Sequence, residues 1–418
     1  MTLKETIHPV KYREAVILLL AKLFNRVKKI IPKFLLRIYH YKLALLGAVI
    51  SGFPGKSKDL KIIGVTGTSG KSTTVDFITR ILEEPFDSAQ GRSGARVASI
   101  STIRFKVAGS KGHLEWENKY KMSMPGRFVI QKFLKQAKDA GCRYVVLEVT
   151  SQGIEQFRHK FINFDTAVFT NLTPEHIESH GGFKNYRNEK LKLFKATKNI
   201  HVINVDDENA KYFLDIPCAQ KIEFSTKDAA NFNDMNALAA ISVAKAYGIG
   251  LDVCKRALAK IKSIPGRMEV ISESPIKVVV DYAHTPAQLE AIYKSLGKNL
   301  VCVLGSCGGG RDKWKRPVLG EIAKKYCREV IITNEDPYDE SPMEIMNQVA
   351  ETAGRPGGHP AQKILDRKEA IETSVKLAKP GDVVIITGKG SEPWMCLENG
   401  KKIPWDDRQI ARDALKNR

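Results

Sequence analysis

A glycine-rich run near the start of the chain has the residue types that bind phosphate. A β-rich stretch at residues 61–66 leads into Gly67-Thr68-Ser69-Gly70-Lys71-Ser72-Thr73-Thr74, and residues 75–82 continue at helical spacing. A strand, a glycine loop and a helix N-terminus together direct backbone N–H groups and the helix dipole at an anion. Lys71 can then reach the β- and γ-phosphates of a nucleotide, and the Ser72 hydroxyl can ligate Mg²⁺. Val65 stands where the strict pattern has glycine, but the flanking elements still predict a phosphate-binding loop.

Two further strands, predicted at residues 143–149 and 166–171, end in polar side chains. Glu148 lies at the end of the first strand, and a buried carboxylate needs a partner because burying an unpaired charge is costly. Beside a phosphate-binding loop, the natural partner is Mg²⁺. The second strand opens into a loop that holds His176 and His180. Ligands bind at the carboxyl ends of parallel strands, so these histidines are candidate ligands, although a structural or solvated role stays open.

The elements that must position these residues indicate an α/β fold. The chain has 418 residues, which is long enough for two or three domains. Residues 61–263 alternate strands and helices and predict a central P-loop ATPase-like domain with a mostly parallel sheet. Residues 264–418 hold apolar strands at 278–281, 300–305, 329–334 and 382–387, which predict a Rossmann-like doubly wound domain. Dinucleotide binding at Gly308-Gly309-Gly310 is disfavoured because no G-x-G-x-x-G motif is present.

Residues 1–60 form a basic segment that differs from the rest of the chain. Residues 1–61 contain thirteen Lys and Arg and three acidic residues, a net charge of +10 out of +21 for the whole chain. Apolar runs at 15–21, 34–38 and 43–50 predict basic amphipathic helices, which can lie on an anionic membrane or pack on the domain behind them. No apolar run is long enough to span a bilayer, and the segment does not read as a secretory signal. We therefore expect a cytoplasmic protein, with peripheral attachment at the inner face of the membrane as an alternative to simple packing.

Composition and cysteine usage exclude several other classes. Hydrophobic residues make up 43% and charged residues 27%, which is ordinary globular usage. The seven cysteines are scattered without a C-x-x-C pair, so neither a zinc site nor a disulfide framework is expected. Nucleic acid is not an expected partner, since no recognised binding motif or aromatic platform accompanies the positive charge.

Ordered blocks across residues 61–410 resemble the Mur ligases, ATP-dependent enzymes that form amide bonds in peptidoglycan assembly. The loop at residues 66–74 is similar to their T-G-T-[NS]-G-K-[ST]-[ST] motif, and Phe169-Thr170-Asn171-Leu172 with His176 and His180-Gly181 is similar to their F-T-N-L…D-H…H-G block. The resemblance continues through Arg267-Met268-Glu269, Asp281-Tyr282-Ala283-His284-Thr285-Pro286, Gly308-Gly309-Gly310-Arg311-Asp312-Lys313 and Gly388-Lys389-Gly390-Ser391-Glu392. The blocks at residues 281–286 and 388–392 favour the branch of this family that adds the third residue of the peptide.

The resemblance implies roles for residues of both predicted domains. Catalysis would fall to Lys71, Glu148, His176 and Lys190. ATP would bind at Gly67, Thr68, Ser69, Gly70, Lys71, Ser72, Thr73, Asn171, Arg267, Asp281 and His284. Two Mg²⁺ ions would be held by Ser72, Glu148, His176 and Lys190, with Lys190 carbamylated so that it presents a carboxylate. The nucleotide-sugar peptide and the amino acid would contact Ser151, Gln156, Arg158, Asp336, Pro337, Gly388 and Glu392.

The implied reaction adds an amino acid to UDP-N-acetylmuramoyl-L-alanyl-D-glutamate through an acyl phosphate. Several features depart from the family pattern: the basic segment stands in place of the N-terminal UDP-binding domain, and Gln152 replaces a frequent histidine. The loop Asn334-Glu335-Asp336-Pro337-Tyr338 lacks the arginine of diaminopimelate-adding members, and residues 85–94 resemble a polar insertion. Two alternatives therefore stay open: a ligase for a lipid-linked or other non-UDP substrate, and a catalytically silent, nucleotide-dependent scaffold.

Overall fold

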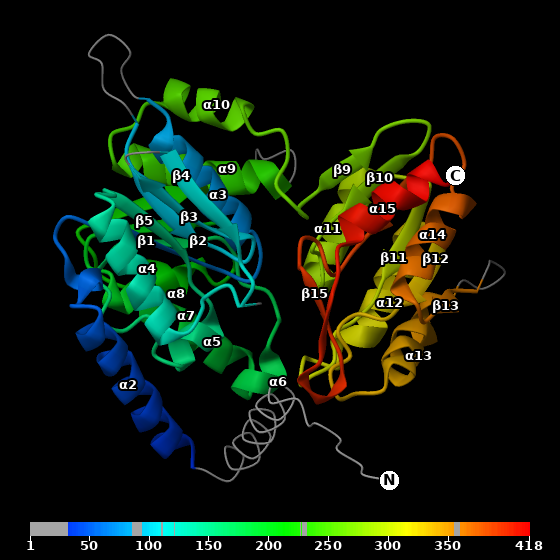
Figure 1. The fold of residues 1–418 in the computed structure, drawn as a ribbon, viewed down its shortest axis with the longest axis horizontal. Helices are drawn as coiled ribbons and strands as arrows, with labels where there is room; N and C mark the ends of the chain where they lie inside the picture. Colours follow the sequence, from blue (N-terminus) through cyan, green and yellow to red (C-terminus); the bar gives the residue numbers. More distant parts are fainter. Residues whose placement is uncertain are drawn as a thin grey trace, which may run out of the picture.

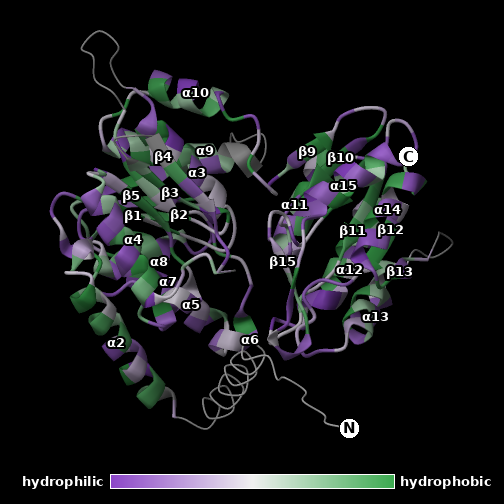
Figure 2. Ribbon diagram, viewed as in Figure 1, coloured by the Kyte–Doolittle hydropathy of each residue, from purple (hydrophilic) through white to green (hydrophobic). Residues whose placement is uncertain are grey.

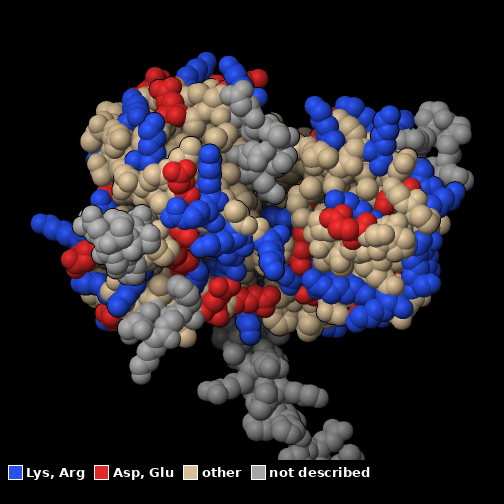
Figure 3. Space-filling view, turned by 90° about the horizontal axis from the view of Figure 1, so that it is seen from above, with Lys and Arg blue, Asp and Glu red and all other residues tan. Residues whose placement is uncertain are grey.

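The computed structural model describes residues 32–85, 94–109, 112–120, 122–225, 227, 232–354 and 360–418. Two α/β halves stand side by side, each built on its own sheet (Figure 1). Lys and Arg side chains are spread over both halves in the view of Figure 3, in keeping with the net charge of +21. The strong positive charge is therefore not confined to the N-terminal segment.

An eight-stranded sheet forms the first half, with strand order β4-β3-β2-β5-β1-β6-β7-β8. Its strands are β1 (Lys61–Thr66), β2 (Val97–Ile100), β3 (Arg104–Gly109), β4 (Gly112–Glu117), β5 (Tyr144–Glu148), β6 (Phe164–Phe169), β7 (Ile200–Asn204) and β8 (Gln220–Phe224). Strand β1 pairs in parallel with β5 and β6, and only β3 runs antiparallel to its neighbours β2 and β4. Five of the six residues of β1 are buried, as expected for a central strand covered on both faces.

Helices cover both faces of this sheet and bury one apolar cluster on each side. One face carries α3 (Lys71–Glu83), α9 (Phe232–Ala246) and α10 (Leu251–Ala259). The other carries α4 (Arg127–Asp139), α5 (Ser151–Glu155), α7 (Phe183–Ala196) and α8 (Ala210–Leu214), while the short α6 (Ile177–His180) lies toward the second half (Figure 1). The carboxyl ends of β1, β5 and β6 thereby point at the second half of the molecule.

A six-stranded sheet with strand order β13-β12-β11-β14-β10-β9 forms the second half. Its strands are β9 (Glu269–Ser272), β10 (Lys277–Val280), β11 (Leu300–Leu304), β12 (Cys327–Thr333), β13 (Gln362–Ile364) and β14 (Val383–Ile386), and β9 alone is antiparallel. Helices α11 (Pro286–Leu296), α12 (Lys315–Tyr326) and α13 (Pro342–Ala353) cover one face, and α14 (Arg367–Leu377) and α15 (Asp407–Lys416) cover the other. A small hairpin of β15 (Trp394–Cys396) and β16 (Lys402–Pro404) and two short 3₁₀ turns, η1 (Pro54–Lys56) and η2 (Glu398–Gly400), complete the described fold.

The predicted fold class is confirmed, since both halves are α/β with mostly parallel sheets. The strands expected at residues 61–66, 143–149, 166–171, 278–281, 300–305, 329–334 and 382–387 all form, within a few residues of the expected ends. The exact domain boundaries stay a prediction; the link between the halves runs from the end of α10 at Ala259 to the start of β9 at Glu269.

The N-terminal segment differs from its prediction in one respect. The apolar runs at 34–38 and 43–50 belong to a single helix, α2 (Lys33–Ile50), because no helix-breaking residue separates them. Hydrophobic residues follow α2 along its length (Figure 2). Across the described ranges, no helix has the length and apolar character needed to cross a membrane. The run at 15–21 lies outside the described residues, as does most of the predicted insertion at 85–94.

A disulfide joins Cys302 and Cys327, contrary to the expectation drawn from the scattered cysteines. The two residues lie on the adjacent strands β11 and β12, with their Cα atoms 6.0 Å apart. Cysteine spacing along the chain could not reveal this pair because parallel pairing of two strands, rather than sequence proximity, brings the side chains together. The other five cysteines are free thiols.

Candidate active site

The phosphate-binding loop joins β1 to α3 in the conformation that its sequence predicts. Gly70 is the residue before the helix and has a φ of 77°, a left-handed conformation that favours glycine. A Cβ at Gly67, where φ is 157°, would lie 1.9 Å from Thr170 Oγ1. The loop is therefore packed tightly against Thr170, directly after β6. Residues 70–73, at the N-terminus of α3, line a cavity.

Lys71 and Asn171 complete the loop in different ways. The Lys71 ammonium donates hydrogen bonds to the carbonyls of Gly67 and Thr68 at 3.1 and 2.9 Å, and burial lowers its pKa. Asn171 was expected to contact the nucleotide, yet its Oδ1 accepts from both the N–H and the hydroxyl of Ser69, at 2.9 and 3.0 Å. Asn171 does not line the cavity, so it supports the loop from behind.

Ser72 and Glu148 form a buried pair of oxygen ligands at the base of the loop. Ser72 Oγ donates to Glu148 Oε2 at 2.8 Å, and the same carboxylate accepts from the N–H of Thr102 at 2.9 Å. Both residues are more than nine-tenths buried and line the cavity. A hydroxyl and a carboxylate side by side are the hard oxygen donors that suit Mg²⁺.

Lys190 lies immediately behind the loop on α7. Its ammonium donates to the carbonyl of Gly67 at 2.7 Å and lies 4.6 Å from the centre of the Tyr186 ring. Burial and, to a smaller extent, the nearby charge of Lys71 hold the pKa of Lys190 well below its ordinary value. The Tyr186 hydroxyl lies 3.1 Å from Thr68 Oγ1, so this aromatic ring links Lys190 to the loop. Lys190 does not itself line the cavity.

His176 and Glu175 lie in the loop between β6 and α6. His176 lines the cavity, and burial, followed by the charge of Arg311, lowers the pKa of this histidine strongly. Glu175 is buried and forms an ion pair with Lys315 of the second half, with 3.1 Å between Oε1 and Nζ. Glu175 was not among the predicted site residues. His176, next to it, was predicted because histidine is a common ligand.

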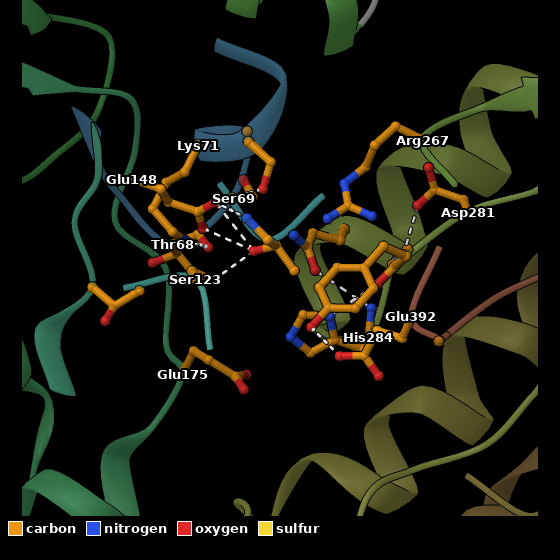
Figure 4. A pocket seen from close by; sticks show the side chains of 18 of the residues that line it. Thr68, Ser69, Lys71, Ser123, Glu148, Glu175, Arg267, Asp281, His284 and Glu392 are labelled. Carbon is orange, nitrogen blue, oxygen red and sulfur yellow. Dashed lines mark hydrogen bonds between the residues drawn. The ribbon is translucent and has the colours of Figure 1, made fainter. Parts of the chain in front are cut away.

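The second half presents Arg267, Asp281 and His284 to the opposite side of the cavity (Figure 4). The Arg267 guanidinium lies over the Tyr282 ring, 4.2 Å from its centre. Asp281 accepts from the N–H groups of Met268 and Ala283 at 2.7 and 2.6 Å, so this carboxylate organises backbone around the site. His284 Nδ1 lies 2.9 Å from the Tyr282 carbonyl, and burial lowers its pKa.

Asp336 and Glu392 both form ion pairs with the buried ammonium group of Lys389. The Lys389 ammonium lies 2.8 Å from Asp336 Oδ2 and 2.7 Å from Glu392 Oε2, and it donates to the Trp394 carbonyl. A Cβ at Gly388 would lie 1.9 Å from Glu335 Oε2, so glycine is required there for close packing. Pro337 does not line the cavity; its carbonyl packs against Gly308.

The expected peptide-contacting residues lie in α5 and directly after it, and Ser151 and Arg158 line the cavity. Ser151 begins α5, and its hydroxyl lies 3.1 Å from His180 Nε2. Arg158 lines the cavity and is held by the Met124 carbonyl and by Gln156 Oε1, the latter at 2.7 Å. Burial lowers the pKa of Arg158 to about 10. Gln156 lies away from the cavity and therefore acts on Arg158.

One cavity of about 420 Å³ runs between the halves and collects most of the predicted residues. Of the predicted residues, those that line it are Thr68, Ser69, Gly70, Lys71, Ser72, Thr73, Glu148, Ser151, Arg158, His176, Arg267, Asp281, His284, Asp336, Gly388 and Glu392. Gly67, Asn171, Gln156, Lys190 and Pro337 lie outside its lining. Sequence reasoning assigned no role to the lining residues Thr102, Glu175, Asn236, Tyr282, Arg311, Lys315 and Glu335, although the G-G-G-R-D-K block contained Arg311.

The predicted metal ligands are brought together only in part. Ser72 and Glu148 are in contact, whereas within the described ranges no group of three or more His, Cys, Asp and Glu side chains is arranged so that it could hold a metal ion. Lys190, as an unmodified amine, is a hydrogen-bond donor in the structure. The oxygen pair thus fits Mg²⁺, and a carboxylate on Lys190 would add a further oxygen donor behind the loop.

Two family models match the chain. The Mur ligase middle domain matches residues 65–249, and the Mur ligase, glutamate ligase domain matches residues 266–390. A relative from Syntrophomonas wolfei, named UDP-N-acetylmuramoyl-L-alanyl-D-glutamate--2,6-diaminopimelate ligase, is 35% identical over 90% of this chain and 82% of its own length. A UDP-N-acetylmuramyl-tripeptide synthetase from Roseiflexus is 34% identical over 92% of this chain and 84% of its own length.

Solved structures show the same fold. A UDP-N-acetylmuramoyl-L-alanyl-D-glutamate--2,6-diaminopimelate ligase superimposes with a TM-score of 0.52 at 29% identity, over 86% of this chain and 79% of that one. A bifunctional folylpolyglutamate synthase/dihydrofolate synthase from Yersinia pestis gives a TM-score of 0.63 at 18% identity, over 90% of this chain and 93% of that one. The second similarity is one of fold alone.

Proposed function

This chain belongs to the Mur ligase family, and on that premise we propose that it joins an amino acid to the carboxylate of a nucleotide-sugar peptide at the expense of ATP. The observation that carries the proposal is the cavity between the halves. A phosphate-binding loop with Lys71 lines one side, and Arg267, His284 and the Lys389-bound acids Asp336 and Glu392 belong to the other. ATP and both substrates can therefore meet in one enclosed space.

The proposed chemistry begins with activation of a carboxylate, which is a poor acyl donor. Transfer of the γ-phosphoryl group of ATP to the carboxylate gives an acyl phosphate and ADP. Such a transfer depends on positioning and on neutralising charge, which the backbone N–H groups of the loop and Lys71 supply. The amine of the amino acid then attacks the acyl carbon, the amide forms, and phosphate leaves. Enclosure between the halves protects the acyl phosphate from water.

Magnesium and a modified lysine belong to the same proposal. Ser72 and Glu148 would hold one Mg²⁺ at the loop, where the ion would neutralise phosphate charge. Lys190 would be carbamylated and, with His176, would take part in holding a second ion. The low pKa of the buried Lys190 supports this assignment, because only the neutral amine reacts with CO₂. The predicted nucleotide contacts that line the cavity, Thr68 to Thr73 with Arg267, Asp281 and His284, would bind ATP.

We propose UDP-N-acetylmuramoyl-L-alanyl-D-glutamate as the acceptor, in line with the names of the two relatives. Arg158 would supply a partly buried positive charge for the acidic peptide, and Ser151 would supply a hydroxyl. Asp336, Gly388 and Glu392 would surround the incoming amino acid, with Pro337 shaping the loop and Gln156 holding Arg158. Tyr338 stands in this loop and lines the cavity.

A lipid-linked acceptor is the alternative favoured by a specific observation. The outward side of α2 is apolar and exposed, which supports peripheral attachment of the protein to an anionic membrane from the cytoplasmic side. An acceptor carried on that membrane would then lie near the enzyme. The attachment and the choice of acceptor are separate proposals, because a membrane-bound enzyme can also act on a soluble nucleotide sugar.

Release of ADP in the presence of Mg²⁺ tests the proposed reaction against the scaffold alternative. We expect ADP release only when the acceptor and an amino acid are both present, with a loss of about 100-fold or more in Lys71→Ala. Lys132→Ala, on the exposed side of α4, is the matched control and should retain full activity. ATP binding without acceptor-dependent ADP release for any acceptor, soluble or lipid-linked, would favour the scaffold.

A further inference from the structure

Helix α2 exposes an apolar face on the side away from the rest of the protein. Its inner residues Ala44 and Ala48 are buried, and a Cβ at Gly47 would lie 3.4 Å from the Phe128 ring of α4. The outer residues recur at helical spacing and are all exposed: Phe34, Leu35, Ile38, Leu45, Leu46 and Val49, which we call the outer face of α2. Phe34 is 62% exposed and Val49 is 53% exposed. Burial of one face in the protein therefore leaves a second, mainly apolar face in water, with the exposed Lys42 among its residues.

A groove lined by positive charge lies between α2, the segment after α5, and α7. The groove has a volume of about 290 Å³ and is lined by Arg37, Ile154, Phe157, His159, Lys160, Lys192, Lys195 and Ala196, a set that we call the basic groove. The Arg37 guanidinium lies 5.7 Å from the centre of the Phe157 ring. Lys192 is paired with Glu189, whereas Arg37, Lys160 and Lys195 have no acidic partner in the part of the chain that the structure describes.

His159 adds a buried polar atom to this groove. The residue is only 4% exposed, and its Nδ1 has no hydrogen-bond partner among the described residues. A buried polar group without a partner is uncommon in folded proteins and asks for an explanation. Three unpaired cations and an unpartnered imidazole nitrogen around one small hollow have the chemistry that recognises a phosphate group.

The groove and the outer face of α2 are neighbours. Arg37 belongs to α2 and follows Phe34 by three residues, so it stands at the border of the apolar face and reaches into the groove. Tyr41, one turn further on, packs edge-on against Phe157 with 5.9 Å between ring centres. The site described between the two halves shares no lining residue with the basic groove. An apolar surface thus borders a basic groove outside the active site, and the groove has room for a phosphate group.

We propose that the outer face of α2 and the basic groove together dock the protein on an anionic phospholipid bilayer, with a lipid phosphate in the groove. The apolar face then enters the boundary between headgroups and acyl chains, while Arg37, Lys160 and Lys195 meet the negative surface. The helix then lies along the membrane, with its buried face on the protein and its outer face toward the acyl chains. This inference rests on the peripheral attachment proposed above and names the residues that would make it. It is independent of the ligase chemistry.

Flotation of the full-length protein with vesicles tests the proposal. The vesicles contain phosphatidylcholine alone or phosphatidylcholine mixed with phosphatidylglycerol, and wild type should float only with the anionic mixture. Each Lys near an anionic surface contributes about fivefold in binding, so Lys160→Gln/Lys195→Gln should lower the partition coefficient roughly 25-fold. Leu45→Ser/Val49→Ser should lower it roughly 10-fold by removing apolar surface from the acyl boundary.

Matched variants separate the site from general charge and hydrophobicity. Lys376→Gln/Lys379→Gln removes two exposed lysines from the second half, and Leu251→Ser removes an exposed leucine from α10; both should float as wild type does. If Lys160→Gln/Lys195→Gln floats as well as Lys376→Gln/Lys379→Gln, the proposed role of the basic groove is wrong. Membrane attachment of the protein would still stand. If wild type fails to float, or floats equally with phosphatidylcholine alone, both the lipid phosphate in the basic groove and the membrane attachment are overturned. The outer face of α2 would then be assigned to a protein partner. Acceptor-dependent ADP release with a soluble acceptor, measured on the same samples, reports on the ligase separately.

Discussion

Glu175 and Lys315 form a buried ion pair that connects the two halves of the molecule. The carboxylate precedes α6 in the first half, the ammonium begins α12 in the second, and 3.1 Å separates Oε1 from Nζ. The same ammonium donates to the His284 carbonyl at 3.1 Å. Asp312, three residues earlier, accepts from the N–H groups of Ile177 and Glu178 at 3.1 and 3.0 Å. These contacts hold the halves together around the cavity.

Removal of Lys315 should therefore destabilise the protein markedly. Lys315→Met leaves Glu175 buried without its partner, and such a loss typically lowers the free energy of unfolding by about 3 kcal/mol or more. The double variant Lys315→Met/Glu175→Leu removes both charges and should recover most of that stability. Urea unfolding of four proteins, wild type, Lys315→Met, Glu175→Leu and the double variant, measures the coupling. Lys325→Met breaks an exposed pair with Glu290 and is the control, which should change stability little. Additive effects of the two buried substitutions would contradict the coupling.

Lys190 should carry a carbamate when the protein is kept in bicarbonate. Its buried amine has a lowered pKa and is therefore available as the neutral nucleophile that CO₂ requires. With ¹³C-labelled bicarbonate, wild type should give a carbamate carbon signal that is absent from Lys190→Ala and present in Lys192→Ala. Ligase activity should fall about 100-fold in Lys190→Ala and recover in part when short carboxylates are added. A wild-type spectrum without that signal would exclude the modification.

The Ser72 hydroxyl should set the concentration of Mg²⁺ that the enzyme requires. Ser72→Ala removes an oxygen from the pair with Glu148, so the half-saturating Mg²⁺ concentration for ADP release should rise by about 10-fold or more. Ser72→Thr keeps the hydroxyl and should stay close to wild type. If the alanine variant loses rate at saturating Mg²⁺ with no change in half-saturation, Ser72 has a different role.

His159 should make the folded protein sensitive to mild acid. Burial, together with the smaller effect of the nearby charges of Lys160 and Lys192, lowers its pKa from 6.5 to about 3. Below pH 6.5 the unfolded chain binds a proton that the folded chain does not bind, so the free energy of unfolding falls as pH falls. Between pH 7 and 5.5 the stability of wild type should drop by about 1 kcal/mol more than that of His159→Gln. Equal losses in both proteins would show that His159 already has a proton or a partner.

Local motifs allowed much of the first half to be predicted from sequence. The strand, loop and helix around Lys71 lie next to one another in the chain, so residue order alone indicated a phosphate-binding loop. Glu148 was found because a carboxylate at the end of a buried strand is unusual, and it does contact Ser72. The resemblance to a family then pointed to Arg267 and His284, which line the opposite side of the cavity.

The contacts between the halves could not be predicted in the same way. Glu175 and Lys315 are 140 residues apart, and nothing in the sequence around either residue specifies its partner. Lys389 was recognised only as part of the G-K-G-x-E block and had no predicted role. The structure places it between Asp336 and Glu392. Asn171 shows the reverse difficulty: a residue of a nucleotide-binding motif supports the loop through Ser69 and lies outside the cavity. Such relationships depend on packing rather than on local pattern.

The mass of the product tests the proposed function most directly. The purified protein is incubated with ATP, Mg²⁺, UDP-N-acetylmuramoyl-L-alanyl-D-glutamate and a panel of amino acids that includes lysine and diaminopimelate, and the acceptor is analysed by mass spectrometry. The account predicts that the acceptor gains the mass of one amino acid, less one water, in step with ADP release, and the gain identifies the amino acid. An acceptor that stays unchanged while the folded protein binds ATP would contradict the UDP-linked substrate.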